Sequence, residues 1–180
     1  MTLPSLGTLT SLPALEHPEL LAPPVAAALR TWPSASGVAV VEIDPAVADT
    51  AAMSEAYGLS MSTGANCVVV AGRRAGEERV AACVVRADTR ADVNNTVKRL
   101  LDVRKASFLA MERAVEESRM EYGGITPVGI PDEWRLLVDS RVTEIEVAVI
   151  GSGVRRSKLL LPGALVADLP RAEVVDGLAG

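Results

Sequence analysis

The sequence predicts a mixed α/β fold of the α+β type: a compact domain with a mixed, largely antiparallel sheet or partial barrel and helices around it. Strand-like and helix-like segments alternate irregularly, whereas a doubly wound parallel sheet requires a regular alternation. Two apolar runs, residues 66–71 and 80–87, are joined by a polar loop with two glycines, which indicates an antiparallel hairpin. Hydrophobic residues fill 49% of the 180 positions, enough for a substantial aliphatic core.

Proline usage divides the chain into two parts. Six of the eleven prolines lie in residues 1–35, where one helix is expected around residues 20–32. We expect this segment to be a loosely attached Pro-rich leader and residues 36–180 to form the main domain.

The main domain is expected to begin with a strand at residues 37–43, which are rich in β-branched side chains. Asp49 or Thr50 can cap the helix that follows, and Gly58 is placed to end it. After the hairpin, apolar residues at helical spacing predict a helix over residues 92–103.

A short strand at residues 105–108 leads into a helix that ends near Arg119. Three later strands are expected at residues 135–138, 145–150 and 158–161. Residues 162–169, with Pro162 near the start, predict a short final helix.

Composition excludes several classes of site. Aromatic residues make up only 3% of the chain, which argues against an aromatic platform for stacked bases. The single histidine, His17, excludes a His-based zinc site and a Ser-His-Asp triad, and no metal or cofactor is predicted. Cys67 and Cys83 lie in apolar runs and are expected to be buried free thiols. No apolar run reaches the about 18 residues that span a membrane, so a soluble, cytoplasmic protein with no membrane partner is expected.

The net charge of −5 argues against non-specific binding to a polyanion. Local basic patches are still compatible with it, and Arg155, Arg156 and Lys158 form one candidate. Solvated loop and helix faces explain such clusters equally well.

The segment from Glu121 to Gly129 reads Glu-Tyr-Gly-Gly-Ile-Thr-Pro-Val-Gly and lies between a predicted helix and a predicted strand. Three glycines and a proline indicate a tight loop with exposed backbone N–H groups. Such a loop can surround a small polar ligand, and a purely structural turn is the alternative interpretation.

Two further features follow this loop. Asp139 ends the next apolar strand, where its carboxylate could bind a substrate amine or accept backbone N–H groups at the strand end. The segment from Gly151 to Lys158 is superficially similar to a phosphate-binding loop. It lacks the Gly-Lys-Ser/Thr ending and leads into a strand, so a hairpin turn is the better interpretation.

The order of these elements resembles the YbaK/ProX-type aminoacyl-tRNA deacylases, the editing domain associated with or inserted in bacterial prolyl-tRNA synthetases. The resemblance covers residues 49–169. Its most specific part is the Gly123–Gly129 loop, which matches the signature Gly-Gly-x-x-Pro-x-Gly. The helix ending at Gly58, the strand ending in Val-Asp139 and the Gly-Ser-Gly turn support it.

The resemblance implies a small pocket in which a mischarged amino acid is hydrolysed from the 3′ end of a tRNA by an enzyme acting in trans. Its partners would be a mischarged aminoacyl-tRNA and, as a second candidate, an aminoacyl-tRNA synthetase. Gly123 and Gly124 would donate N–H groups to the ester carbonyl, where an oxyanion develops. The implied substrate-binding residues are Ile125, Thr126, Pro127, Gly129, Asp139, Ser152 and Gly153.

Asn66 departs from the family pattern, which places a functional lysine at this position. An amide can orient a substrate by hydrogen bonding, and we expect Asn66 to do so, but it brings no charge. The rival hypothesis is therefore a non-catalytic protein that binds an aminoacyl-tRNA end, a nucleotide or a small metabolite. The third hypothesis is a structural or interaction module of the same fold.

Overall fold

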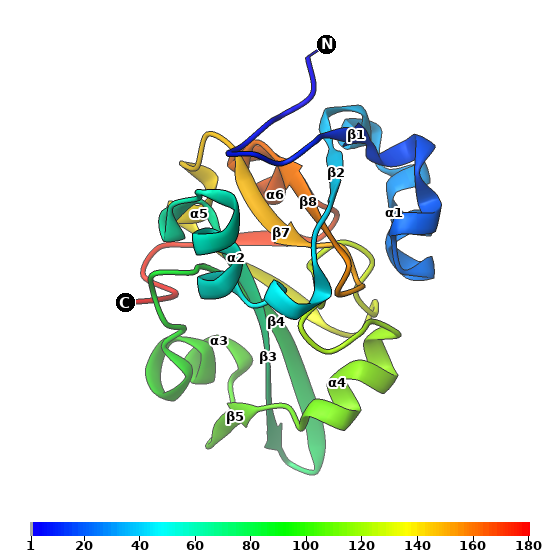
Figure 1. Cartoon of the computed structure of the whole chain (residues 1–180). Coiled ribbons are helices and arrows are strands. Elements are labelled where there is room, and N and C mark those ends of the chain that lie inside the picture. The colour runs from blue at the N-terminus through cyan, green and yellow to red at the C-terminus, as the bar shows by residue number, and fades with distance from the viewer. Residues whose placement is uncertain (1) are drawn as a thin grey trace.

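Two β-sheets with short helices around them make up the chain in the computed structural model, which describes residues 2–180 (Figure 1). The strands are β1 (Leu12–Pro13), β2 (Ala39–Glu42), β3 (Ala65–Arg74), β4 (Glu77–Arg86), β5 (Ala106–Phe108), β6 (Arg135–Asp139), β7 (Ala148–Gly151), β8 (Ser157–Leu161) and β9 (Ala172–Val175). The α-helices are α1 (Pro23–Thr31), α2 (Thr50–Tyr57), α3 (Lys98–Leu101), α4 (Met111–Ser118), α5 (Ser140–Thr143) and α6 (Gly163–Ala167).

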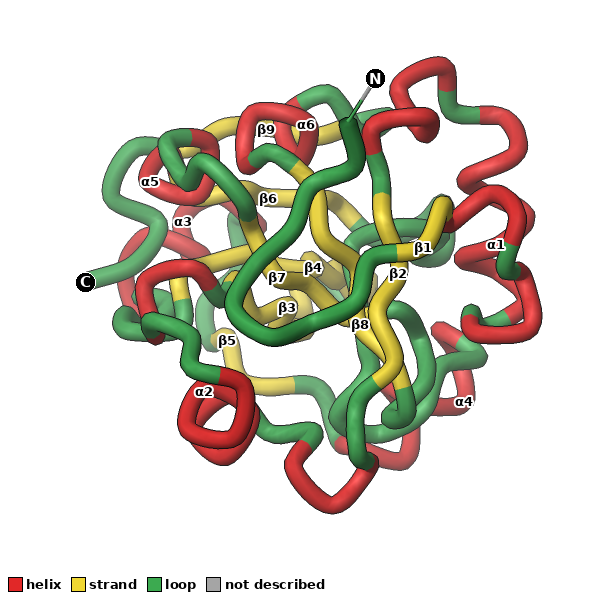
Figure 2. The backbone as a smooth tube through the Cα atoms, turned by 45° about the horizontal axis from the view of Figure 1, so that its top comes forward, coloured by secondary structure: helices red, strands yellow, loops and turns green. Residues whose placement is uncertain are grey.

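The first sheet has the strand order β1-β2-β8-β7 and is antiparallel throughout. The second has the order β5-β3-β4-β6-β9, in which β6 pairs in parallel with both β4 and β9. A parallel bridge between Gly64 and Val149 links the two sheets. Figure 2 shows the strands crossing near the centre with the helices around the outside. The predicted mixed, largely antiparallel fold is confirmed as two open sheets.

The β3–β4 hairpin is longer than its apolar runs predict. Its strands pair from Ala65 with Arg86 as far as Arg74 with Glu77. The turn consists of Ala75 and Gly76, with φ angles of 50° and 81°. Two consecutive left-handed residues match the twist of the flanking strands, so the ladder continues into the polar loop.

Helix α2 begins and ends where the sequence predicts. The Asp49 carboxylate accepts a hydrogen bond from the Ala52 N–H at 3.1 Å, and Gly58 ends the helix with φ of 68°. A carboxylate at this end also suits the positive end of the helix dipole. These local signals place the first turn of α2 beside the N-terminal end of β3.

Most other elements also form where they are predicted. The helix expected at residues 92–103 is a π-helical turn, Val93–Val97, that continues into α3, and the Asp92 side chain caps it. The strand expected at residues 145–150 begins only at Ala148. Helix α5 and strand β9 have no counterpart among the predicted elements.

The proline-rich N-terminal segment is packed on the domain, which differs from the loose attachment expected. The predicted helix forms as α1, and Leu20, Val25, Leu29 and Trp32 are buried in the main hydrophobic cluster. Strand β1 extends the first sheet next to β2, and α1 lies beside these strands (Figure 1). Apolar side chains at helical spacing form the buried face of α1, which the proline content alone does not indicate.

Within residues 2–180, every helix is too short or too polar to cross a membrane.

The packing of this segment predicts the effect of Trp32→Ala. Trp32 is buried, and its Nε1 donates a hydrogen bond to the Asp168 carbonyl at 3.2 Å. The substitution should lower the free energy of unfolding by about 3–5 kcal/mol, measured by urea denaturation. Leu15→Ala, at an exposed position of the same segment, should change it by less than about 0.5 kcal/mol. Equal, small effects would show that the segment does not contribute to the core.

Candidate functional site

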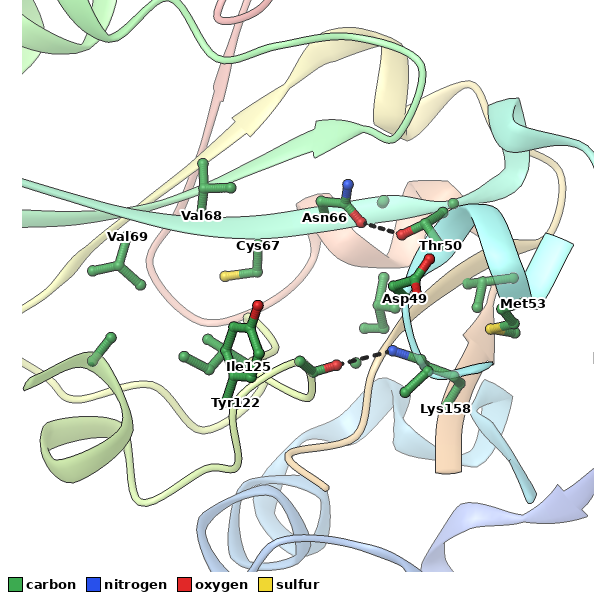
Figure 3. A pocket seen from close by; sticks show the side chains of 18 of the residues that line it. Asp49, Thr50, Met53, Asn66, Cys67, Val68, Val69, Tyr122, Ile125 and Lys158 are labelled. Atoms are coloured by element: carbon green, nitrogen blue, oxygen red, sulfur yellow. Dashed lines mark hydrogen bonds between the residues drawn. The ribbon is translucent and has the colours of Figure 1, made fainter. Parts of the chain in front are cut away.

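A cavity of about 490 Å³ opens between α2, β3, the loop from Glu121 to Gly129 (the glycine loop) and the β7–β8 hairpin (Figure 3). This volume is typical of sites that bind small molecules, which range over about 300–1,000 Å³. Much of the wall is apolar and is formed by Met53, Val69, Leu109, Ile125, Val149 and Ile150. Among the described residues, Asp49 and Lys158 are the only charged side chains in the lining.

The glycine loop is fastened to the turn between β7 and β8 by two backbone hydrogen bonds. The Glu121 N–H donates to the Gly153 carbonyl at 2.8 Å, and the Gly153 N–H donates to the Gly124 carbonyl at 2.7 Å. The Gly124 N–H donates to the Glu121 carbonyl at 2.9 Å. It is therefore engaged inside the loop and is not free to stabilise an ester oxyanion.

Packing explains why Gly124 is a glycine. A Cβ atom at this position would lie 2.8 Å from the backbone nitrogen of Val154. A Cβ atom on Gly151, in the neighbouring strand, would lie 2.5 Å from the Gly124 carbonyl oxygen. A larger side chain at position 124 would disturb the loop itself, so the position is unsuited to testing chemistry.

The structure brings together three of the residues singled out from the sequence: Asn66, Gly123 and Ile125 all line the cavity. The other seven lie outside its lining: Gly124, Thr126, Pro127, Gly129, Asp139, Ser152 and Gly153. Several of these support the loop or the core. Gly129, with φ of 80°, lies against the Pro24 carbonyl, and the buried Ser152 hydroxyl bonds that of Ser157 at 2.7 Å.

Asp139 takes the second of the two roles open to it. Its carboxylate is buried and accepts hydrogen bonds from the backbone N–H groups of Arg141 at 3.0 Å and Ala179 at 2.9 Å. The Arg141 guanidinium adds a third at 3.0 Å. Burial acts to raise the pKa of this carboxyl, but these bonds hold it below its usual value. Asp139 therefore ties β6 to the C-terminal segment.

Asn66 lies at the edge of the cavity next to α2. Its Oδ1 accepts a hydrogen bond from the Thr50 hydroxyl at 2.9 Å (Figure 3). This bond leaves the amide NH₂ group as the donor that Asn66 can offer to a ligand.

Lys158 is the site residue that the sequence patterns did not identify. The sequence places it beside Arg155 and Arg156 in a candidate basic patch, but its side chain is only 9% exposed and points into the cavity (Figure 3). Its Nζ donates to the Gly123 carbonyl at 3.2 Å. Burial lowers the pKa of the ammonium group to about 8, and the nearby Arg155 charge acts in the same direction. A lysine opening an otherwise apolar strand was the signal available in the sequence.

Cys67 also lines the cavity, but its chemistry is limited. Both cysteines are free, as predicted. Burial raises the pKa of the Cys67 thiol and raises that of Cys83 to about 12. Since the thiolate is the nucleophilic form, Cys67 is a neutral wall residue near neutral pH. Across residues 2–180, no three His, Cys, Asp or Glu side chains gather into a metal-binding cluster, and the expectation of no metal stays a prediction.

The sequence profile of the aminoacyl-tRNA editing domain family matches residues 44–169. The chain belongs to this family. The match includes every residue that lines the cavity, and it confirms the resemblance seen in the glycine loop.

Solved structures share the fold of this editing domain. That of a candidate trans-editing enzyme for prolyl tRNA synthetase has a TM-score of 0.73 and 20% sequence identity, over 86% of this chain and 94% of that one. The hypothetical protein APE2540 has a TM-score of 0.69 and 20% identity, over 78% of this chain and 90% of its own. A search among curated proteins finds no match to the sequence.

The burial of Lys158 predicts how Lys158→Met affects stability. Removing a buried ammonium should raise the free energy of unfolding at neutral pH by about 1–2 kcal/mol. Between the folded pKa of about 8 and the ordinary 10.5, the unfolded chain binds a proton that the folded chain releases. Wild-type stability therefore rises with pH across this window, and the advantage of the variant shrinks.

Urea denaturation at several pH values measures this difference, with Lys105→Met at an exposed position as the control. A less stable Lys158→Met variant, or a difference that does not change with pH, would contradict the prediction.

Proposed function

We propose that this editing domain hydrolyses, in trans and in the cytoplasm, the ester of a mischarged aminoacyl-tRNA. The observation that carries the proposal is that one carboxylate, Asp49, and one ammonium group, Lys158, both line a largely apolar cavity. An aminoacyl ester offers a cationic amine, a polar carbonyl and a side chain, and the cavity has a complementary surface for each.

Asp49 is the partner proposed for the α-ammonium group of the substrate. One of its carboxylate oxygens accepts the Ala52 N–H at the start of α2, and the side chain is otherwise exposed at the cavity. Its second oxygen can accept a hydrogen bond from an amine. A hydrogen bond to a charged group contributes about 1.5–3 kcal/mol, enough to orient the substrate.

Two aromatic side chains mark the place proposed for the terminal adenosine. Phe108 and Tyr122 line the cavity and are 63% and 59% exposed. The Arg155 guanidinium lies 5.9 Å from the centre of the Tyr122 ring. Although aromatic residues are scarce in the chain, these two give a nucleobase an apolar surface on which to stack.

The proposed reaction needs no protein nucleophile. A water molecule attacks the carbonyl carbon, and the carbonyl π electrons move to oxygen to form a tetrahedral oxyanion. When this intermediate collapses, the bond to the ribose oxygen breaks, and that oxygen takes the proton lost by the attacking water. The neighbouring ribose hydroxyl can relay this proton. The products are the free amino acid and a tRNA with a free 3′ hydroxyl.

Asn66 supports the second candidate function, a non-catalytic protein that binds an aminoacyl-tRNA end. It provides a neutral amide where the resemblance places a lysine, so this position lacks the positive charge of the family's functional residue. Turnover distinguishes the two candidates, because a binding protein protects the ester whereas a deacylase releases the amino acid.

The proposal predicts hydrolysis of at least one member of a panel of mischarged tRNAs: Ala-, Cys- and Ser-tRNA on the proline acceptor. The similarity to a candidate trans-editing enzyme for prolyl tRNA synthetase motivates this panel. Asp49→Asn should lower kcat/KM about 10- to 100-fold, since the amide keeps the helix cap but loses the charge.

Asp44→Asn is the matched control, because Asp44 caps a 3₁₀ turn in the same way and lies outside the cavity lining. Its kcat/KM should stay at the wild-type value. No turnover above the spontaneous rate for any of the substrates would refute the deacylase. Turnover that Asp49→Asn leaves unchanged would refute the role of Asp49.

A further inference from the structure

Lys158 is the only buried lysine of the three in the chain; the other two are Lys98 and Lys105. The ion pairs found among residues 2–180 join arginine or histidine to acidic side chains, and none includes Lys158. Its single hydrogen-bond acceptor in this part of the chain is the neutral Gly123 carbonyl. An ammonium group has three N–H donors, so two are left for the cavity.

This arrangement is unfavourable for folding alone. A buried ammonium without a carboxylate partner is costly, and a leucine or methionine would fill the same position in an apolar strand. The residues that follow in β8, Leu159, Leu160 and Leu161, are all buried and apolar. A ligand oxygen in the cavity would supply the missing partner.

We propose that Lys158 is a catalytic residue of this site, which donates its two free N–H groups to the ester carbonyl oxygen of the bound aminoacyl group and to the oxyanion formed there. This inference rests on the proposed deacylase function and assigns the electrophilic group that the function requires. Lys158 gains and loses no proton in the step, and water remains the attacking group.

The charges around the cavity favour the carbonyl oxygen over the other groups of the substrate. The Lys158 ammonium repels the α-ammonium of the amino acid, which Asp49 attracts instead. In an aminoacyl ester, the amine and the carbonyl are attached to adjacent carbon atoms. A substrate whose amine meets Asp49 on α2 can thus present its carbonyl oxygen to Lys158 on β8.

In the proposed mechanism, the positive charge is that of Lys158. It lies on the cavity wall opposite Asn66, the position where the resemblance places a lysine. Figure 3 shows Asn66 and Thr50 on one side of the cavity and Lys158 on the other. Asn66, with its neutral amide, can orient the substrate, while Lys158 stabilises charge. The site would therefore still have a cationic electrophile, the Lys158 ammonium group, although Asn66 occupies the position where a lysine is expected.

The site also sets the expected pH dependence. Two charged groups act on Lys158, Asp49 at the N-cap of α2 and Arg155 in the β7–β8 turn. The other titratable groups that line the cavity are Tyr122 from the glycine loop and Cys67 from β3. Lys158 changes its charge with a pKa of about 8, and kcat/KM, corrected for spontaneous hydrolysis, should fall above this pH.

The decisive experiment compares deacylation by wild type, Lys158→Met, Lys105→Met and the double variant Asn66→Lys/Lys158→Met. Lys158→Met should lower kcat about 100- to 1,000-fold, as expected for loss of an oxyanion donor, and should abolish the fall above pH about 8. Lys105→Met should match wild type. The double variant restores a charge from the facing strand and should recover about tenfold or more of the lost activity.

An active wild type with an equally active Lys158→Met variant would overturn this inference and leave the deacylase standing. An inactive wild type would refute the deacylase. The role of Lys158 is then tested by measuring how tightly wild type and variant bind a substrate analogue. The probe is an adenosine that carries an aminoacyl group through a 3′ amide, titrated by calorimetry into wild type and Lys158→Met. Binding that weakens about tenfold in the variant would support contact with the carbonyl, whereas equal binding or none would refute it.

Discussion

The close crossing of two backbone segments, the glycine loop and the β7–β8 hairpin, determines the shape of the site. At this crossing Gly124 and Gly151 approach so closely that a Cβ atom on either would overlap the backbone of the other segment. Two backbone hydrogen bonds hold the segments together. The same crossing directs the Gly123 carbonyl toward Lys158 and forms one wall of the cavity. The glycines are thus required mainly for close packing, and their value as exposed N–H donors is secondary.

Local signals predicted most of the elements, because they act over a few residues. The Asp49 cap, the Gly58 terminus and the hairpin runs each depend on neighbours in sequence. The insertion of β6 between β4 and β9 could not be predicted in this way, since it depends on packing between distant segments. The sequence predicts the N-terminal helix but not its burial. The proline content indicates a loosely attached segment, whereas the apolar side chains of the helix pack into the core.

The candidate site was predictable only in part, for the same reason. Asn66, Gly123 and Ile125 were found through one motif and one aligned position, and the structure brings them to one cavity. Lys158 comes from a strand whose approach to β3 depends on the contact between the two sheets. Its pattern in the sequence, a charge at the start of an apolar strand, also fits a solvent-exposed strand end. Only the fold shows that this end is buried.

Among the Asp, Glu, Lys, Arg and His side chains in the described part of the chain, Asp139 and Lys158 are the two that are buried. Their surroundings show that one has a structural role and that the other is available to a ligand. Asp139 receives hydrogen bonds from Arg141 and Ala179, so its charge is satisfied by the fold. Lys158 has one neutral acceptor and faces the cavity. It lies on β8, which is paired on both sides, by β2 and by β7, so its Cα is held firmly. An electrophile fixed in this way needs little reorganisation as an oxyanion forms, which is the condition under which a buried charge accelerates ester hydrolysis most.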